Sequence, residues 1–120
     1  MRLLALRGAT TCTEDTKAEI DAKTQRLVRE MLERNGIAHD DIVSIIFTAT
    51  DDLVAEFPAT AARAQGLGDI PLLCARELGI TKGMKRCIRI MMHFYGEQDR
   101  ATLHHVYLED ARALRDDLPE

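Results

Sequence analysis

Residues 16–34 carry the longest helical pattern in the sequence, and they restrict the possible folds more than any other segment. Thr16 and Glu19 have the spacing of a capping box, which satisfies free backbone amides at the start of a helix. Asn35-Gly36 supplies the left-handed residue that commonly ends one. Between these signals, the apolar residues at helical spacing are Ile20, Leu27, Val28, Met31 and Leu32. The sequence therefore predicts one long helix with a single apolar side.

The other apolar segments are shorter and predict strands. They cover residues 2–9, 42–49, 70–74, 86–95 and 103–108. A short helix is predicted over 58–65, where Pro58 suits the first helical position, and one helical turn over 111–114. Residues 76–84 are predicted to be irregular. This order is an α+β pattern, with a five-stranded mixed sheet and one long helix. Because one helix covers only one face of such a sheet, the second face is predicted to be buried in an oligomer.

Length and charge limit the protein class. The 120 residues suit a single domain spanning 1–120, in which about 111–120 form a charged tail. The apolar runs are far shorter than a membrane span, and Arg2 and Arg7 interrupt any secretory signal, so a cytoplasmic protein is expected. The net charge of −4 argues against nucleic acid as a partner.

Familiar catalytic and metal-binding motifs are missing from the sequence. The three cysteines, Cys12, Cys74 and Cys87, form no C-x-x-C pair. His104 and His105 would point to opposite faces of a strand, so they are not expected to chelate one ion. No nucleophile elbow, phosphate-binding loop or dinucleotide fingerprint occurs. We therefore expect neither a metal nor another cofactor.

Arg89 is the most informative charged residue, because it lies in the middle of the apolar strand 86–95. One face of that strand carries Ile88, Ile90, Met92 and Phe94, and the other carries Cys87, Arg89, Met91 and His93. A desolvated arginine needs an opposite charge. Its partner is predicted to be either a protein carboxylate or an anionic ligand, and Glu77 could be that carboxylate or could itself face a ligand.

Six segments, in order, resemble the small monofunctional chorismate mutases of the AroH class. The resemblance runs from about residue 3 to residue 118. Its segments are residues 7–11, 48–53, 57–59 with Arg63, Cys74-x-x-Glu77, 87–92, and 105–109 with Leu114-Arg115. It implies a homotrimeric pseudo-α/β barrel, a fold shared with RidA-like proteins, with active sites between subunits. It also implies the isomerisation of chorismate to prephenate, a Claisen rearrangement used in the biosynthesis of phenylalanine and tyrosine.

The resemblance assigns roles to individual positions. Arg89 is similar to the cation beside the breaking ether bond, Glu77 to the acceptor for the ring hydroxyl, and Arg7 and Tyr107 to carboxylate binders. Arg63 and Arg115 match residues at the entrance. The other implied substrate contacts are Cys74, Leu73, Phe57, Ala59 and Leu114. Read without the resemblance, Cys74 is a small buried apolar residue, Tyr107 a packed aromatic and Arg115 a solvated charge.

Two positions depart from the family pattern, and both concern substrate affinity. Thr60 stands where a lysine is common, and Leu73 where a small polar residue is expected. Three other functions remain open from the residues alone. They are a trimeric imine or enamine deaminase, a small-molecule sensing module and a purely structural trimer.

Overall fold

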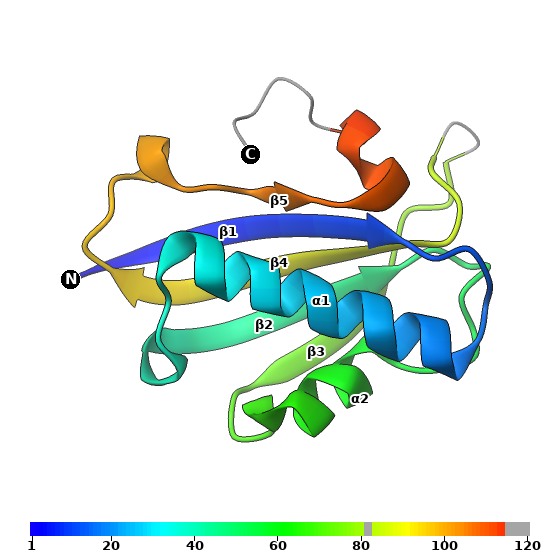
Figure 1. Ribbon diagram of the computed structural model, residues 1–120, viewed down its shortest axis with the longest axis horizontal. Helices are drawn as coiled ribbons and strands as arrows, with labels where there is room; N and C mark the ends of the chain where they lie inside the picture. Colours follow the sequence, from blue (N-terminus) through cyan, green and yellow to red (C-terminus); the bar gives the residue numbers. More distant parts are fainter. Residues whose placement is uncertain (81–82, 115–120) are drawn as a thin grey trace.

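The computed structural model describes residues 1–80 and 83–114, and its centre is a five-stranded sheet of order β3-β2-β4-β1-β5 (Figure 1). β4 runs antiparallel to both of its neighbours, whereas β5 is parallel to β1 and β3 is parallel to β2, which confirms the predicted mixed sheet. The strands are β1 (Arg2–Thr11), β2 (Ile42–Ala49), β3 (Leu72–Arg76), β4 (Cys87–Gly96) and β5 (Val106–Tyr107).

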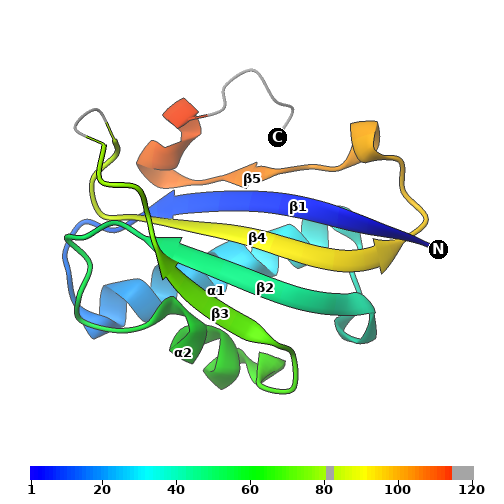
Figure 2. The same ribbon diagram turned by 180° about the vertical axis from the view of Figure 1, so that it is seen from behind.

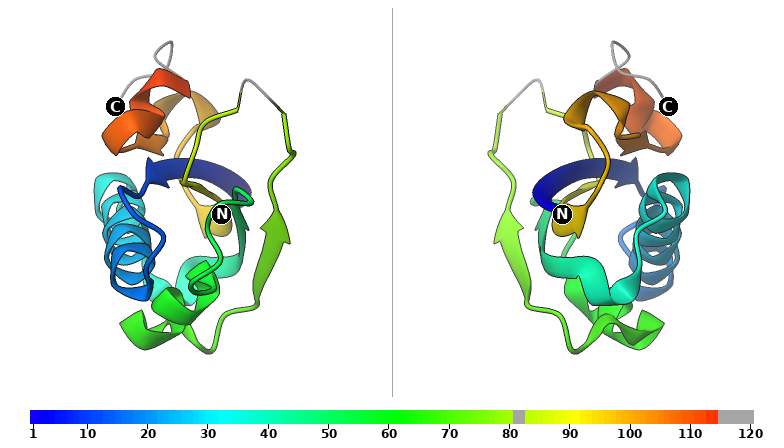
Figure 3. Two further views of the ribbon diagram at one scale, coloured as in Figure 1. Left: turned by 90° about the vertical axis from the view of Figure 1, so that its right-hand side faces the viewer. Right: turned by 90° about the vertical axis from the view of Figure 1, so that its left-hand side faces the viewer.

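The helices are one long element and several short ones. The long helix α1 packs on one face of the sheet, and seen from behind, the strands lie in front of it with their other face toward the viewer (Figure 2). End-on views place α1 and β3 on opposite sides of β4 (Figure 3). The helical elements are α1 (Lys17–Asn35), α2 (Pro58–Ala62), η1 (His39–Asp41), η2 (Arg63–Leu67), η3 (Arg100–Thr102) and η4 (Glu109–Leu114). No helix in the described part of the chain is long and apolar enough to span a membrane.

The predicted helix over 16–34 is confirmed as α1, and its caps explain its ends. The Thr16 hydroxyl accepts a hydrogen bond from the Glu19 amide at 3.1 Å. The Glu19 carboxylate does not complete a capping box, because it accepts from the amide and hydroxyl of Thr13. Gly36, with φ 58°, ends the helix in the left-handed conformation.

Several predicted strand ends are wrong. β1 continues through Thr11 because its last residues pair with Ile88 and Cys87, so the lead into α1 starts later than expected. β3 begins at Leu72 rather than at residue 70, and the last strand shrinks to Val106–Tyr107. The helical turn after Pro58 runs on to Leu67 through Gly66, which has φ 97°. In each case the pairing partner or a local turn, not the apolar pattern, sets the boundary.

The main core lies between α1 and the sheet. Leu6, Phe47 and Met92 from the strands meet Leu27 and Met31 from the helix, and all five are fully buried. On β4 the predicted inner face is confirmed, since Ile88, Ile90, Met92 and Phe94 are buried. The opposite sheet face is more open and carries both charged and apolar side chains.

Gly8 lets α1 approach β1 closely. A Cβ at this position would lie 2.5 Å from Met31 Sδ and 3.1 Å from Leu27 Cδ1. Both side chains are fully buried, so relieving these contacts would require them to repack within the core. The absence of a side chain at Gly8 therefore sets the spacing between helix and sheet.

We expect Gly8→Ala to lower the free energy of unfolding by about 1–3 kcal/mol, the usual cost of overpacking a core. Gly68→Ala is the matched control, because its Cβ would lie 3.8 Å from Arg63 Cγ and its φ is −68°. That control should leave stability unchanged or slightly raised. Urea unfolding of both variants measures the difference, and equal stabilities would contradict the close packing at Gly8.

Candidate active site

The strand register places several predicted site residues on the open face of the sheet. Ala9 of β1 is opposite both Arg89 of β4 and Tyr107 of β5, and Thr48 of β2 is opposite Arg89 on its other side. Arg7 is two residues before Ala9 and therefore shares its face. The sequence pattern of β4 alone indicated that Arg89 would face this side.

These residues line one hollow of about 210 Å³. Its walls come from four neighbouring strands and from Glu77, just after β3. The lining residues are Arg7, Gly8, Ile46, Thr48, Glu77, Arg89, Ile90, Met91 and Tyr107. The hollow thus combines two guanidinium groups, one carboxylate and one phenol with an apolar floor, which suits an anionic organic ligand.

Arg89 is less buried than the sequence suggested. Its side chain is 45% exposed, because the hollow opens beside it. Nη1 of Arg89 lies 3.8 Å from Oε2 of Glu77, which makes Glu77 its ion-pair partner in the described part of the chain. At that distance the pair is loose. A guanidinium carries five N–H donors, so Arg89 retains donors that can be directed at a ligand.

Glu77 is fixed by its neighbours. The Thr48 hydroxyl donates to Oε2 at 2.8 Å, and the Glu77 amide donates to the Ala49 carbonyl at 3.0 Å. The carboxylate is therefore oriented from β2 before any ligand arrives. Sequence reasoning gave Thr48 no role, because nothing in the chain near Glu77 marks this contact.

His105 supports the other end of the hollow. The Arg7 amide donates to Nδ1 of His105 at 3.0 Å, which ties β1 to the segment just before Tyr107. An accepting Nδ1 requires the tautomer that carries its proton on Nε2. Sequence reasoning excluded this histidine as a metal ligand and included it in the resemblance segment 105–109 without a role. Its supporting role was missed because it depends on a contact between distant segments.

The remaining predicted site residues lie outside this hollow. Phe57 and Cys74 line a second hollow of about 460 Å³, where Phe57 is 66% exposed. Cys74 packs against the core on the helix side of the sheet, so within one chain it is on the opposite face from Arg89. Leu114 lines a third hollow of about 450 Å³ that also touches Glu77 and Arg89.

Of the four remaining predicted site residues, three lie away from the Arg89 hollow and the fourth is outside the described residues. Ala59 is buried in the core beside α1, whereas Leu73 is exposed on the open side of β3. Arg63 is exposed where α2 ends, and none of these three lines the Arg89 hollow. Arg115 lies outside the described residues, as does the part of the predicted tail that follows Leu114.

A network of hydrogen bonds around Asp52, called the Asp52 network below, connects the end of β2 to the start of β4, next to Arg89. Asp52 accepts two hydrogen bonds from the Arg86 amide, at 3.0 and 2.9 Å, and a third from the Thr50 hydroxyl. Arg86 has φ 47°, an unfavourable conformation for a residue with a Cβ. The same Thr50 hydroxyl accepts from the Cys87 amide at 2.9 Å. These contacts fix the residues from which β4 starts.

Two of the three cysteines are unlike reactive thiols, and the described acidic side chains do not form a metal site. Burial raises the pKa of Cys12 and that of Cys87 to about 11, so both thiols are protonated near neutral pH and are poor nucleophiles. Across residues 1–80 and 83–114, no three His, Cys, Asp or Glu side chains gather as a metal site would require. The arrangement is suited to binding and to electrostatic stabilisation.

Comparison with known proteins adds a family to this geometry. The family model described as chorismate mutase type I matches residues 3–118. The chain is 40% identical to chorismate mutase AroH of Bacillus subtilis over 119 residues, which covers 98% of this chain and 94% of the relative. It is 41% identical over 114 residues to chorismate mutase AroH of Thermus thermophilus, covering 94% and 93% of the two chains. A solved chorismate mutase from Clostridium thermocellum matches with a TM-score of 0.90 and 47% identity, covering 92% of this chain and 98% of that one.

Replacing Asp52 with asparagine should destabilise the protein in a pH-dependent way. Burial acts to raise the Asp52 pKa, but hydrogen bonds from Thr50 and the Arg86 amide hold the pKa below its ordinary value of 3.8. Because the pKa is lowered on folding, the stabilisation is present above pH 3.8 and is lost as the pH falls through the lower folded value. We expect Asp52→Asn to cost at most about 1 kcal/mol at pH 7, with the gap to wild type closing in acid.

Urea unfolding at pH 7 and at pH 3 measures this gap. Asp51→Asn is the matched control, because the Asp51 carboxylate pairs only at the surface with Arg76, at 3.2 Å. A pH-independent difference in unfolding free energy for Asp52→Asn, or an equal effect in the control, would contradict the stabilising role of the Asp52 network.

Proposed function

This chain belongs to the type I chorismate mutase family, and we propose that it converts chorismate to prephenate in the Arg89 hollow. The observation that carries the proposal is the meeting of Arg7, Glu77, Arg89 and Tyr107 on one open sheet face. An isomerase of this kind needs no nucleophile and no proton transfer. A site made of two cations, a carboxylate and a phenol, with the thiols of Cys12 and Cys87 held protonated, agrees with that requirement.

The reaction is an intramolecular rearrangement of a dianion. The ether C–O bond breaks while a C–C bond forms, and negative charge develops on the ether oxygen as positive charge spreads over the ring. The enzyme has to hold the compact conformer with its reacting ends together and to stabilise the separating charges. We assign the ether oxygen to Arg89, whose donors are incompletely used by Glu77 at 3.8 Å.

The other side chains bind and orient the substrate. Arg7 and Tyr107, in β1 and β5, are assigned to substrate carboxylates, since a guanidinium and a phenol O–H both donate to an anion. Glu77 is assigned to the ring hydroxyl, and its negative charge also faces the ring on which positive charge develops. Its hydrogen bond from Thr48 fixes the carboxylate for that purpose.

We further propose that the working enzyme is a homotrimer whose active sites lie between subunits. The open sheet face supports this, because Leu3, Leu73 and Tyr95 expose 57%, 60% and 46% of their surfaces there. Phe57 and Cys74 lie away from Arg89 within one chain, so a neighbour is needed to bring such groups together. Phe57 and Arg63, which are both exposed, would then reach the site from across the subunit boundary, whereas Ala59 would only pack beneath them.

Leu114, Arg63 and Arg115 are assigned to the rim of the entrance. Leu114 lines the hollow that adjoins Glu77 and Arg89, which supports its place there. Thr60 and Leu73, the two departures from the family pattern, would change affinity and leave the charge-stabilising groups intact. The product is a precursor of phenylalanine and tyrosine, so we place the enzyme in their biosynthesis, in the cytoplasm.

Mutation of Arg89 tests the function and its central residue together. Purified protein should consume chorismate, followed by loss of its diene absorbance, and form prephenate, identified by acid conversion to phenylpyruvate. Arg89→Ala should lower kcat by about 10²–10³, the usual cost of removing a preorganised donor. Arg89→Lys should remain well below wild type, because an ammonium lacks the planar fork. Arg29→Lys, at an exposed position on α1, is the matched control and should keep full activity.

Two results would contradict this assignment. Absence of turnover in the folded wild-type protein would exclude the mutase function. Near-normal turnover in Arg89→Lys or Arg89→Ala would keep the function and remove Arg89 from its centre.

Subunit mixing tests the shared site. Sedimentation should give three times the chain mass of 13.5 kDa. Arg89→Ala and Phe57→Asp should each be nearly inactive, but trimers refolded from a mixture should regain activity, because some sites then contain neither substitution. A monomer in sedimentation, or a mixture no more active than its parts, would contradict a site built from two subunits.

A further inference from the structure

Glu109 lies between two parts of the proposed site and has an unusual backbone conformation. It follows Tyr107 by two residues and begins η4, which ends at Leu114. Its φ of 53° lies in the left-handed region, where a residue with a Cβ is unfavourable. This turn directs the chain from β5 into η4, so the position of Leu114 relative to Tyr107 depends on it.

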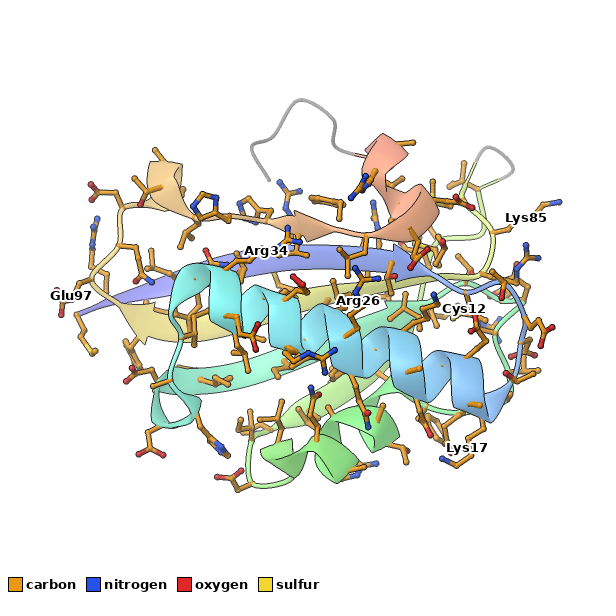
Figure 4. The ribbon with its side chains drawn as sticks, in the orientation of Figure 1. Cys12, Lys17, Arg26, Arg34, Lys85 and Glu97 are labelled. Carbon is orange, nitrogen blue, oxygen red and sulfur yellow. The ribbon has the colours of Figure 1, made fainter. Side chains whose placement is uncertain are left out.

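The Glu109 side chain is bound by two cations of α1. Oε1 lies 3.1 Å from Lys23 Nζ and 3.3 Å from Arg26 Nη1. The exposed fractions of the Lys23, Glu109 and Arg26 side chains are 22%, 35% and 49%, so the cluster is partly shielded from water. In Figure 4 Arg26 lies midway along α1, on the part of the helix nearer to η4, whereas Arg34 lies closer to its end.

Hydrogen bonds donated by two backbone amides hold the same turn to β1. The Leu108 amide donates to the Ala9 carbonyl at 2.9 Å, and the Asp110 amide donates to the Thr11 hydroxyl at 3.2 Å. Ala111, within η4, is fully buried. Glu109 therefore lies between two residues that are hydrogen-bonded to β1. Its own side chain contacts α1, which packs on the sheet face opposite the Arg89 hollow.

We propose that Glu109 is a positioning residue for the mutase site. Its ion pairs with Lys23 and Arg26 hold the left-handed turn in place, and the turn in turn fixes Tyr107 and Leu114 beside Arg89. This inference rests on the proposed function of the hollow. Tyr107 and Leu114 are assigned to substrate binding rather than to charge stabilisation. Loss of the Glu109 ion pairs should therefore weaken chorismate binding more than it slows the reaction of bound chorismate.

The central test compares Glu109→Gln with wild type in chorismate turnover. We expect KM to rise about fivefold, the scale of two partly exposed ion pairs, while kcat changes less than about twofold. Arg26→Gln should also raise KM. The double variant should be little worse than Glu109→Gln alone, since both changes remove the same contact. Arg34→Gln is the matched control, because Arg34 pairs with Glu30 on its own helix, at 3.0 Å, and should leave KM unchanged.

Hydrogen exchange supplies a readout that does not depend on catalysis. The amides of Leu108 and Asp110 should exchange about fivefold faster in Glu109→Gln, and at the wild-type rate in Arg34→Gln. Glu109→Gly removes the carboxylate but favours the positive φ. It should behave like Glu109→Gln, because the ion pairs and not the backbone preference hold the turn.

Three results would overturn the inference. They are an unchanged KM in a folded Glu109→Gln enzyme, wild-type exchange at Leu108 and Asp110 in that variant, and full recovery in Glu109→Gly. A wild-type protein without turnover would contradict the proposed function instead, and the exchange rates would still decide whether Glu109 anchors the turn.

Discussion

The close packing of α1 on β1 at Gly8 is the contact on which the rest of the molecule depends. It places the one long helix on a single face of the sheet and closes the core there, with Leu27 and Met31 pressed against the strand. The other face of the same strands is then available for polar groups. The main core fills the helix side of the sheet, and the polar groups of the candidate site lie on the opposite face.

The position of Arg89 follows from this separation of the two sheet faces. β4 is hydrogen-bonded along both edges, to β1 and to β2, which makes it the central strand. Its inward residues, Ile88 and Ile90, are buried, and the alternation of a strand turns Arg89 outward with its backbone fixed on both sides. The cation that we assign to the developing charge is therefore carried by a strand whose backbone is hydrogen-bonded on both sides.

Local signals in the sequence predicted the parts of this arrangement that depend on local chemistry. The caps at Thr16 and Gly36 gave α1 almost to the residue, and alternation gave the two faces of β4. The ends of β1 and β3, and the exposure of Arg89, were missed because pairing partners and an opening between strands decide them. Thr48, His105 and Glu109 were missed for a related reason, since each acts through a contact with a residue far away in the sequence. The role of each site residue came only from the family resemblance.

An enzyme that catalyses a rearrangement without proton transfer has to position its substrate and its binding groups, and it needs no reactive side chain. The supporting contacts here meet that need from different elements: Thr48 orients Glu77 from β2, His105 ties β1 to the start of β5, and Asp52 fixes the residues before β4. Glu109 adds a tie from the C-terminal turn to α1. Each supporting side chain restrains a different strand or turn, so the geometry of the hollow is set by tertiary contacts around it. Under the proposed function, these supporting residues set the affinity for the substrate without touching it.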